Sequence, residues 1–216
     1  KLRMTETKHI DFKAGEVLLV NKPLHWTSFD VVNKLRYELK QALGIKKIKV
    51  GHAGTLDPLA DGLLIICTGK KTKEINDYMG MVKRYSGTIT LGATTPSYDL
   101  ETEGEQDQMP PIFSAKKIKG KKAYDLARAG EEVVLKPKRI RIDKFDITGI
   151  EMPNVSFDIV CSTGTYIRSI AHDFGQLLNN GAYLSSLRRE KIGEFSLADA
   201  KSVDEWIAII QQQEKL

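Results

Sequence analysis

The strongest limit on the fold comes from a glycine-rich turn, GHAGTLDPLADG at residues 51–62, which directly precedes the apolar run of residues 63–66. Glycine allows backbone conformations that other residues avoid, and the proline after Asp57 fixes the backbone there. The turn therefore presents the Asp57 carboxylate rigidly, and we take Asp57 as the candidate catalytic residue. A structural interpretation stays open, in which Asp57 only caps the turn before a strand, as Asp often does beside Pro or Gly.

Hydrophobic periodicity predicts strands and helices that interleave irregularly along the chain. Apolar runs and period-two alternation predict strands at residues 16–20, 63–67, 85–91, 139–150 and 155–161. Helical spacing and capping signals predict helices at residues 27–43, 73–79, 122–129 and 165–178. Because several connections are hairpin-like, we expect a mixed α/β (α+β) domain with a central, largely antiparallel sheet flanked by helices.

Composition excludes several classes of protein. The chain has 216 residues, of which 41% are hydrophobic, and no apolar run approaches the length of a membrane-spanning helix. Its two cysteines lie in strand-like contexts, and residues 1–13 lack the apolar stretch of a secretory signal. Its four histidines show no metal-ligand spacing with the cysteines. We therefore expect a cytoplasmic protein that binds neither a membrane nor a metal.

Basic residues gather in clusters, although the net charge of +5 is modest. The clusters lie at residues 46–49, 70–73, 83–84, 116–122, 136–141 and 188–191. Solvated lysines that keep a protein soluble explain any one cluster well enough. The clusters together indicate a polyanionic partner, and nucleic acid is the natural candidate.

Two further positions gain interest in combination with Asp57. Tyr85 follows Lys83 and Arg84, so an aromatic ring that could stack on a base stands beside cations that could hold its phosphate. A buried strand tyrosine is the alternative. Arg168 lies among apolar helix neighbours and needs a carboxylate partner unless it lies at the surface. If Asp57 is that partner, the pair would keep Asp57 ionised near neutral pH.

These residues together resemble the TruB-type tRNA pseudouridine synthases. The matching segments cover nearly the whole chain in the family's order. They are the opening strand with its Lys-Pro turn (15–23), the catalytic-aspartate motif (51–62), the basic-aromatic motif (83–85), the RNA-gripping segment (110–116 with 120–130), the active-site arginine motif (164–168) and the apolar floor of the site (187–189). Six motifs in series make a chance resemblance improbable.

The resemblance implies a pseudouridine synthase catalytic fold. It implies a single domain over residues 1–216 with an RNA-gripping insert around residues 99–130, and without the C-terminal PUA domain that many members append. The implied activity is isomerisation of uridine 55 in the T-loop of tRNA to pseudouridine, after the base is turned out of the loop. This rearrangement needs no redox step, cofactor or metal. The implied partner is the T-arm of tRNA, and a monomer is the simplest state.

The resemblance also assigns roles at the site. Asp57 acts on the bound nucleotide, either by covalent attack or by taking a sugar proton to give a glycal, and both routes stay open. The residues assigned to binding the nucleotide are His52, Tyr85, Tyr166, Arg168 and Leu187. Among them, His52 displaces the target base by stacking into the RNA, and Arg168 pairs with Asp57. Lys22 and Lys73 match motif positions with structural or phosphate-contacting roles.

One departure and two rival functions remain open. The acidic turn at residues 103–108 leads almost directly to Pro110, whereas the family usually has a longer insert between these motifs. Either the insert is short in this chain or its residues are missing from it. We expect a chain break between about residues 103 and 109. A noncatalytic RNA-binding or RNA-folding protein would use the same basic clusters. A metal-dependent RNA hydrolase would use Asp57 and His52. The combination of Asp57, Tyr85 and Arg168 favours the synthase, because a pure binder has no need of a carboxylate facing phosphates.

Overall fold

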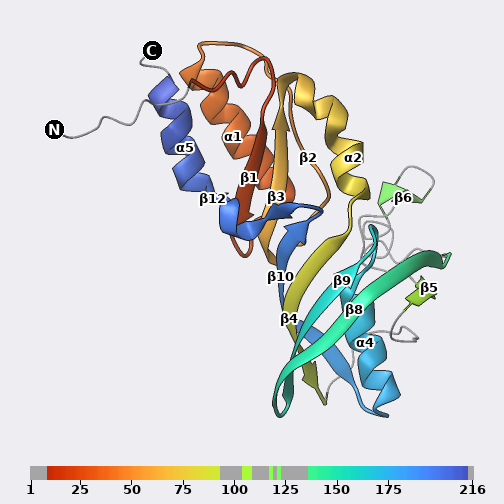
Figure 1. Ribbon diagram of the computed structural model, residues 1–216. Coiled ribbons are helices and arrows are strands. Elements are labelled where there is room, and N and C mark those ends of the chain that lie inside the picture. The colour runs from red at the N-terminus through yellow and green to blue at the C-terminus, as the bar shows by residue number, and fades with distance from the viewer. Residues whose placement is uncertain (1–8, 93–103, 109–116, 119–120, 123–135, 214–216) are drawn as a thin grey trace. The chain divides into compact units, whose positions relative to one another are not determined.

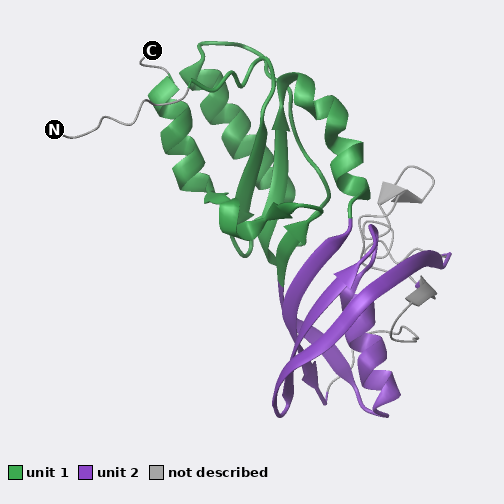
Figure 2. Ribbon diagram, viewed as in Figure 1, with its two compact units in different colours: residues 1–81, 188–216 green, residues 82–187 purple. Residues whose placement is uncertain are grey.

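The computed structural model describes residues 9–92, 104–108, 117–118, 121–122 and 136–213 (Figure 1). The chain divides into two compact units, shown in different colours in Figure 2. Unit 1 comprises Lys1–Met81 with Arg188–Leu216, and unit 2 comprises Val82–Leu187. The expectation that residues 1–216 act as one catalytic domain stays a prediction.

Unit 1 contains a mixed sheet in which the strand order is β12-β1-β3-β10. β1 pairs antiparallel with β3, β2 pairs antiparallel with β3, and β10 pairs parallel with β3. β12 runs parallel to β1, and β11 pairs antiparallel with β10. The strand bounds are β1 Val17–Lys22, β2 Val50–His52, β3 Asp61–Thr68, β10 Ala182–Ile192, β11 Phe195–Ser196 and β12 Lys201–Ser202.

Strand β3 is buried on both faces, which explains its uninterrupted apolar sequence. On one face, Leu64 and Ile66 belong to a core that includes Leu35 of helix α1 (Ser28–Ala42) and Ile210 of helix α5 (Val203–Gln212). The other face packs with Tyr78 of the short helix α2. Figure 1 shows α1 and α5 on one side of these strands and α2 on the other. The remaining bounds are η1 Gly69–Glu74, α2 Ile75–Gly80 and η2 Leu197–Asp199.

Unit 2 contains antiparallel strands and one described helix. Its strand order is β10-β4-β9-β8-β5, and the first residues of β10 belong to it. Helix α4 packs on the sheet through Phe174, whose ring lies 6.1 Å from that of Phe145 on β8. Lys117–Ile118 (β6) and Lys121–Lys122 (β7) pair with each other. The other bounds are β4 Lys83–Leu91, β5 Gly104–Gln108, β8 Lys138–Glu151, β9 Asn154–Cys161 and α4 Ile167–Leu177.

The predicted fold class is confirmed: the chain is mixed α/β with a largely antiparallel sheet and flanking helices. The helix expected at residues 73–79 begins earlier, as a 3-10 helix at Gly69 that continues into α2. The periodicity did not predict β10 or α5. The helix expected at residues 122–129 lies almost wholly outside the described residues. Gly104–Gln108 form β5 against β8, and the chain break expected between about residues 103 and 109 stays a prediction.

Candidate active site

Asp57 lies in an exposed loop of unit 1 between β2 and β3, and the backbone on both sides of it is held by hydrogen bonds. On the N-terminal side, the Leu56 amide donates to Ser28 Oγ at 2.8 Å, and Ser28 Oγ donates to the Leu56 carbonyl at 3.1 Å. On the other side, the Pro58 carbonyl accepts from the His25 amide at 2.6 Å. The loop therefore holds the exposed residue Asp57 on a fixed backbone.

Arg189 holds the same loop from beneath, although its side chain is only 1% exposed. Its Nε donates to the Leu63 carbonyl at 2.7 Å, Nη2 to the Gly54 carbonyl at 3.2 Å and Nη1 to the Thr55 carbonyl at 3.4 Å. A buried cation requires such partners. The backbone of Arg189 lies close to that of Gly62, where only glycine fits. The φ of Gly62 is +105°, and a Cβ there would lie 2.5 Å from the Arg189 carbonyl oxygen. Arg189 is thus a positioning residue for the loop.

Lys22 is a second buried cation near Asp57. Its side chain is fully buried, and Nζ donates to the carbonyls of Pro23 at 2.9 Å and Trp26 at 2.6 Å. Burial lowers the pKa of Lys22 to about 8, while the negative charges of Asp61 and Asp57 act in the opposite direction. Of the two roles that the resemblance offered, the structural one fits this burial.

His52 ends β2, on the approach to the Asp57 loop. Its Nδ1 is buried without a hydrogen-bond partner in the described part of the chain. Burial lowers the pKa of His52, and the positive charge of Arg189 lowers it further. A neutral imidazole suits stacking on a base. That role stays a prediction.

Four of the predicted site residues lie in unit 2. Tyr166 precedes helix α4 and Arg168 lies in its first turn. Gln108, only 4% exposed, fixes the Tyr166 backbone: the Tyr166 amide donates to Gln108 Oε1 at 2.6 Å, and Gln108 Nε2 donates to the Tyr166 carbonyl at 3.0 Å. Half-buried Leu187 lies on β10, and Tyr85 lies on β4. No sequence pattern pointed to Gln108.

The expectation that Lys83 and Arg84 form a phosphate-binding pair beside Tyr85 is wrong. Successive strand residues face opposite sides of a sheet. Lys83 and Tyr85 accordingly share the buried face of β4 and are 5% and 8% exposed. Arg84 faces outward and pairs with Asp158 on β9, with Nη2 at 2.7 Å from Oδ2. Tyr85 is a buried strand tyrosine, and its stacking on the target base stays a prediction.

The predicted site residues are thus divided between the two units. Asp57 and His52 belong to unit 1, whereas Tyr85, Tyr166, Arg168 and Leu187 belong to unit 2. Pairing of Asp57 with Arg168 therefore stays a prediction. Most of the segment resembling the RNA-gripping motif, at residues 110–116 and 120–130, lies outside the described residues.

Other reactive groups in the described ranges suggest no different chemistry. Burial raises the pKa of the Cys67 thiol to about 11 and that of the Cys161 thiol to about 12, so both stay protonated near neutral pH. The described residues contain no group of three His, Cys, Asp or Glu side chains that could hold a metal ion. Within the same ranges, no helix has the length and apolar character needed to cross a membrane.

The model of the TruB family pseudouridylate synthase N-terminal domain matches residues 40–104 and 100–167. The chain belongs to the TruB family. Alignments with curated relatives cover more of this chain than the family model does. A protein of Phocaeicola vulgatus named tRNA pseudouridine synthase B is 49% identical, with 95% of this chain and 97% of that protein covered. The protein of the same name from Flavobacterium johnsoniae is 50% identical, with 88% and 93% covered.

The matches also bear on the short acidic turn. The two segments that match the family model overlap at residues 100–104, so the match is interrupted there. The alignment with the Phocaeicola vulgatus protein runs over 228 residues, although this chain has 216. That relative therefore has residues without a counterpart here.

Solved structures support the fold. A Cbf5-Nop10-Gar1 complex contains a chain that matches with a TM-score of 0.66 at 24% identity, covering 94% of this chain and 62% of that one. A chain of an archaeal box H/ACA sRNP Nop10-Cbf5 complex matches with a TM-score of 0.65 at 21% identity, covering 99% and 61%. The TruB-family chain thus spans about three fifths of the length of those chains. The predicted pseudouridine synthase fold is confirmed.

Proposed function

We propose that this TruB-family chain is a tRNA pseudouridine synthase, an isomerase that converts uridine 55 of the T-loop to pseudouridine. The observation that carries the proposal is the exposed carboxylate of Asp57 on a backbone held by Ser28, His25 and Arg189. The near full-length identity with proteins named tRNA pseudouridine synthase B supports the same activity.

In the proposed reaction, Asp57 acts on the flipped nucleotide. The bond between N1 of uracil and C1′ breaks, the base turns, and a bond forms between C5 and C1′. C5 then loses its proton to solvent and N1 takes up a proton from solvent, so the product is an isomer of the substrate. Electrons balance without an oxidant or reductant. Asp57 starts the sequence either by attacking the nucleotide or by taking a sugar proton. A carboxylate preorganised by its surroundings avoids reorganisation during the reaction.

The binding residues would act around this carboxylate. Arg168 would pair with Asp57 and hold it ionised, while Tyr166 and Leu187 line the pocket of the uracil. Tyr85 would stack on the base and assist proton removal at C5. Unstacking a base costs about a few kcal/mol, which these contacts would offset. We place the enzyme in the cytoplasm as a monomer, where it binds the T-arm through its basic clusters.

The test is release of tritium from tRNA that carries C5-labelled uridine. Wild type should release tritium, and Asp57→Asn should release none while it still binds tRNA. Asp77→Asn is a matched control, since Asp77 is an exposed acid on α2 of the same unit. Substantial turnover by Asp57→Asn would remove Asp57 from its central role. Binding without release by the wild type, on several unmodified tRNAs, would favour the RNA-binding alternative. Cleavage of the tRNA that a chelator abolishes would favour the metal-dependent hydrolase.

A further inference from the structure

Unit 1 contains a pocket of about 350 Å³ whose lining is dominated by lysine. No acidic side chain and no aromatic ring contribute to the lining. The residues that line it are Lys13, Lys47, Ile48, Lys49, Gly69, Lys70, Thr72 and Lys73. We call this set the lysine pocket.

The pocket is built by three segments that lie far apart in the sequence. The Gly69 amide donates to the Lys49 carbonyl at 2.9 Å, and the Lys70 amide donates to the Ala14 carbonyl at 3.0 Å. Gly69 has a φ of +51°, and a Cβ there would lie 2.4 Å from the Lys13 carbonyl oxygen. Backbone hydrogen bonds and one required glycine therefore bring the lysines together.

The charge of the pocket is not neutralised within the described part of the protein. None of its five lysines has an ion pair or a side-chain hydrogen bond with another described residue. By contrast, Lys71 of the same segment pairs with Glu74 at 2.8 Å and does not line the pocket. A cluster of cations without acidic partners attracts anions.

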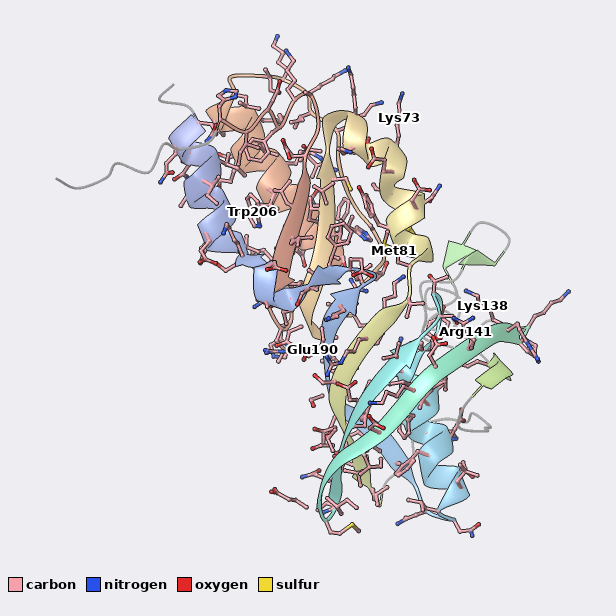
Figure 3. All side chains as sticks on the ribbon, viewed as in Figure 1. Lys73, Met81, Lys138, Arg141, Glu190 and Trp206 are labelled. Atoms are coloured by element: carbon pink, nitrogen blue, oxygen red, sulfur yellow. The ribbon has the colours of Figure 1, made fainter. Side chains whose placement is uncertain are left out.

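The pocket lies at the opposite end of β3 from the Asp57 loop. The loop precedes Asp61, where β3 begins, and the Gly69–Lys73 segment follows Thr68, where it ends. Eight strand residues separate the two sites by about 25 Å. In Figure 3, Lys73 is labelled at one end of unit 1 and Glu190, the neighbour of Arg189, at the other. The pocket is therefore separate from the site that would receive the uridine.

We propose that the lysine pocket binds backbone phosphates of the RNA substrate at a segment remote from the target uridine. This inference rests on the proposed function. Lysine is a compact point charge without the fork geometry that arginine offers to bases and phosphates. The lining has no ring on which a base could stack. The pocket thus recognises charge and not sequence, and it positions the RNA while Asp57 acts elsewhere.

The test compares two double variants of equal charge. Lys47→Gln with Lys70→Gln removes two charges from the pocket, whereas Lys40→Gln with Lys201→Gln removes two charges elsewhere in unit 1. Binding of unmodified tRNA is measured against salt concentration. The pocket variant should raise Kd and reduce the slope of log K against log salt by about two, and the control should leave both near wild type.

Steady-state tritium release separates binding from folding damage. The pocket variant should raise KM while kcat at saturating tRNA stays unchanged, because the pocket is remote from Asp57. Lys47→Arg with Lys70→Arg keeps both charges and should restore the wild-type KM. Equal Kd and salt slope in the pocket and control variants would overturn the inference and leave the proposed function standing.

Two other outcomes would also overturn it. Loss of inorganic phosphate binding in the pocket variant, with tRNA affinity unchanged, would assign the pocket to a free anion. Failure of the wild type to bind any tRNA would remove the proposed function and this inference with it.

Discussion

Replacing Arg189 by methionine would test whether a buried cation positions the Asp57 loop. Methionine keeps much of the length of arginine but has no donor for the carbonyls of Leu63, Gly54 and Thr55. An unsatisfied buried acceptor costs about 1–3 kcal/mol, and the short bond to Leu63 should account for most of the loss. The two longer bonds, to the part-buried carbonyls of Thr55 and Gly54, should add a smaller loss. In total, we expect the free energy of unfolding to fall by about 2–4 kcal/mol. The melting temperature should then fall by about 4–16 °C.

The same substitution should reduce catalysis. Without its anchor the loop can shift, and a displacement of about 1 Å at a reacting group can cost about a hundredfold in rate. We therefore expect kcat for tritium release to fall strongly at a temperature where circular dichroism shows the variant to be folded. Affinity for tRNA should change little, because Arg189 is buried and does not face the RNA.

Arg188→Met is the matched control, because Arg188 is the adjacent residue on β10. Its side chain is exposed and pairs with Asp61 at 2.8 Å, and an ion pair of this kind contributes about 0–1 kcal/mol. The reasoning would be refuted if Arg189→Met lost no more stability than Arg188→Met. It would also fail if Arg189→Met lost stability but kept its kcat.

Two further substitutions probe buried polar groups near Asp57. Ser28→Ala removes the hydroxyl that bonds both the amide and the carbonyl of buried Leu56. The free energy of unfolding measured in urea should fall by about 1–3 kcal/mol, and tritium release should slow. An unchanged urea midpoint would contradict this. Lys22 has a folded-state pKa of about 8 and an ordinary value of 10.5, so between these values the unfolded chain holds a proton that the folded chain lacks. Stability should therefore rise with pH across that window in the wild type but not in Lys22→Met, and parallel urea curves for the two would refute the assignment.

Elements with local signals were predictable from the sequence. Helix α1 begins at a capping box in which Thr27 and Asp30 bond each other's backbone amides, and its apolar spacing is helical. The β8–β9 hairpin follows from two alternating runs around a Met-Pro-Asn turn. Strand β10 was missed because its charged residues give it no apolar pattern, and its place depends on pairing with β3 across more than a hundred residues.

The support of the site was less predictable than the site itself. Arg188 and Arg189 formed one basic cluster in the sequence, yet strand alternation turns Arg188 outward and Arg189 inward. Which of them faces inward depends on the register between β10 and β3, which no local pattern encodes. Similarly, no local pattern marks Ser28, the first residue of α1, as a partner of Leu56, and only the folded chain brings the two together.

Burial divides the cations of unit 1 into two groups with different physical roles. Lys22 and Arg189 are almost fully buried and donate to backbone carbonyls, so they stabilise the fold and cannot release counterions from RNA. Lys47 and Lys70 are exposed, and no described residue pairs with them. The salt slope of tRNA binding should therefore report only the exposed group. Substituting a buried cation should lower stability and leave the slope unchanged, whereas substituting exposed pocket lysines should lower the slope and leave stability unchanged.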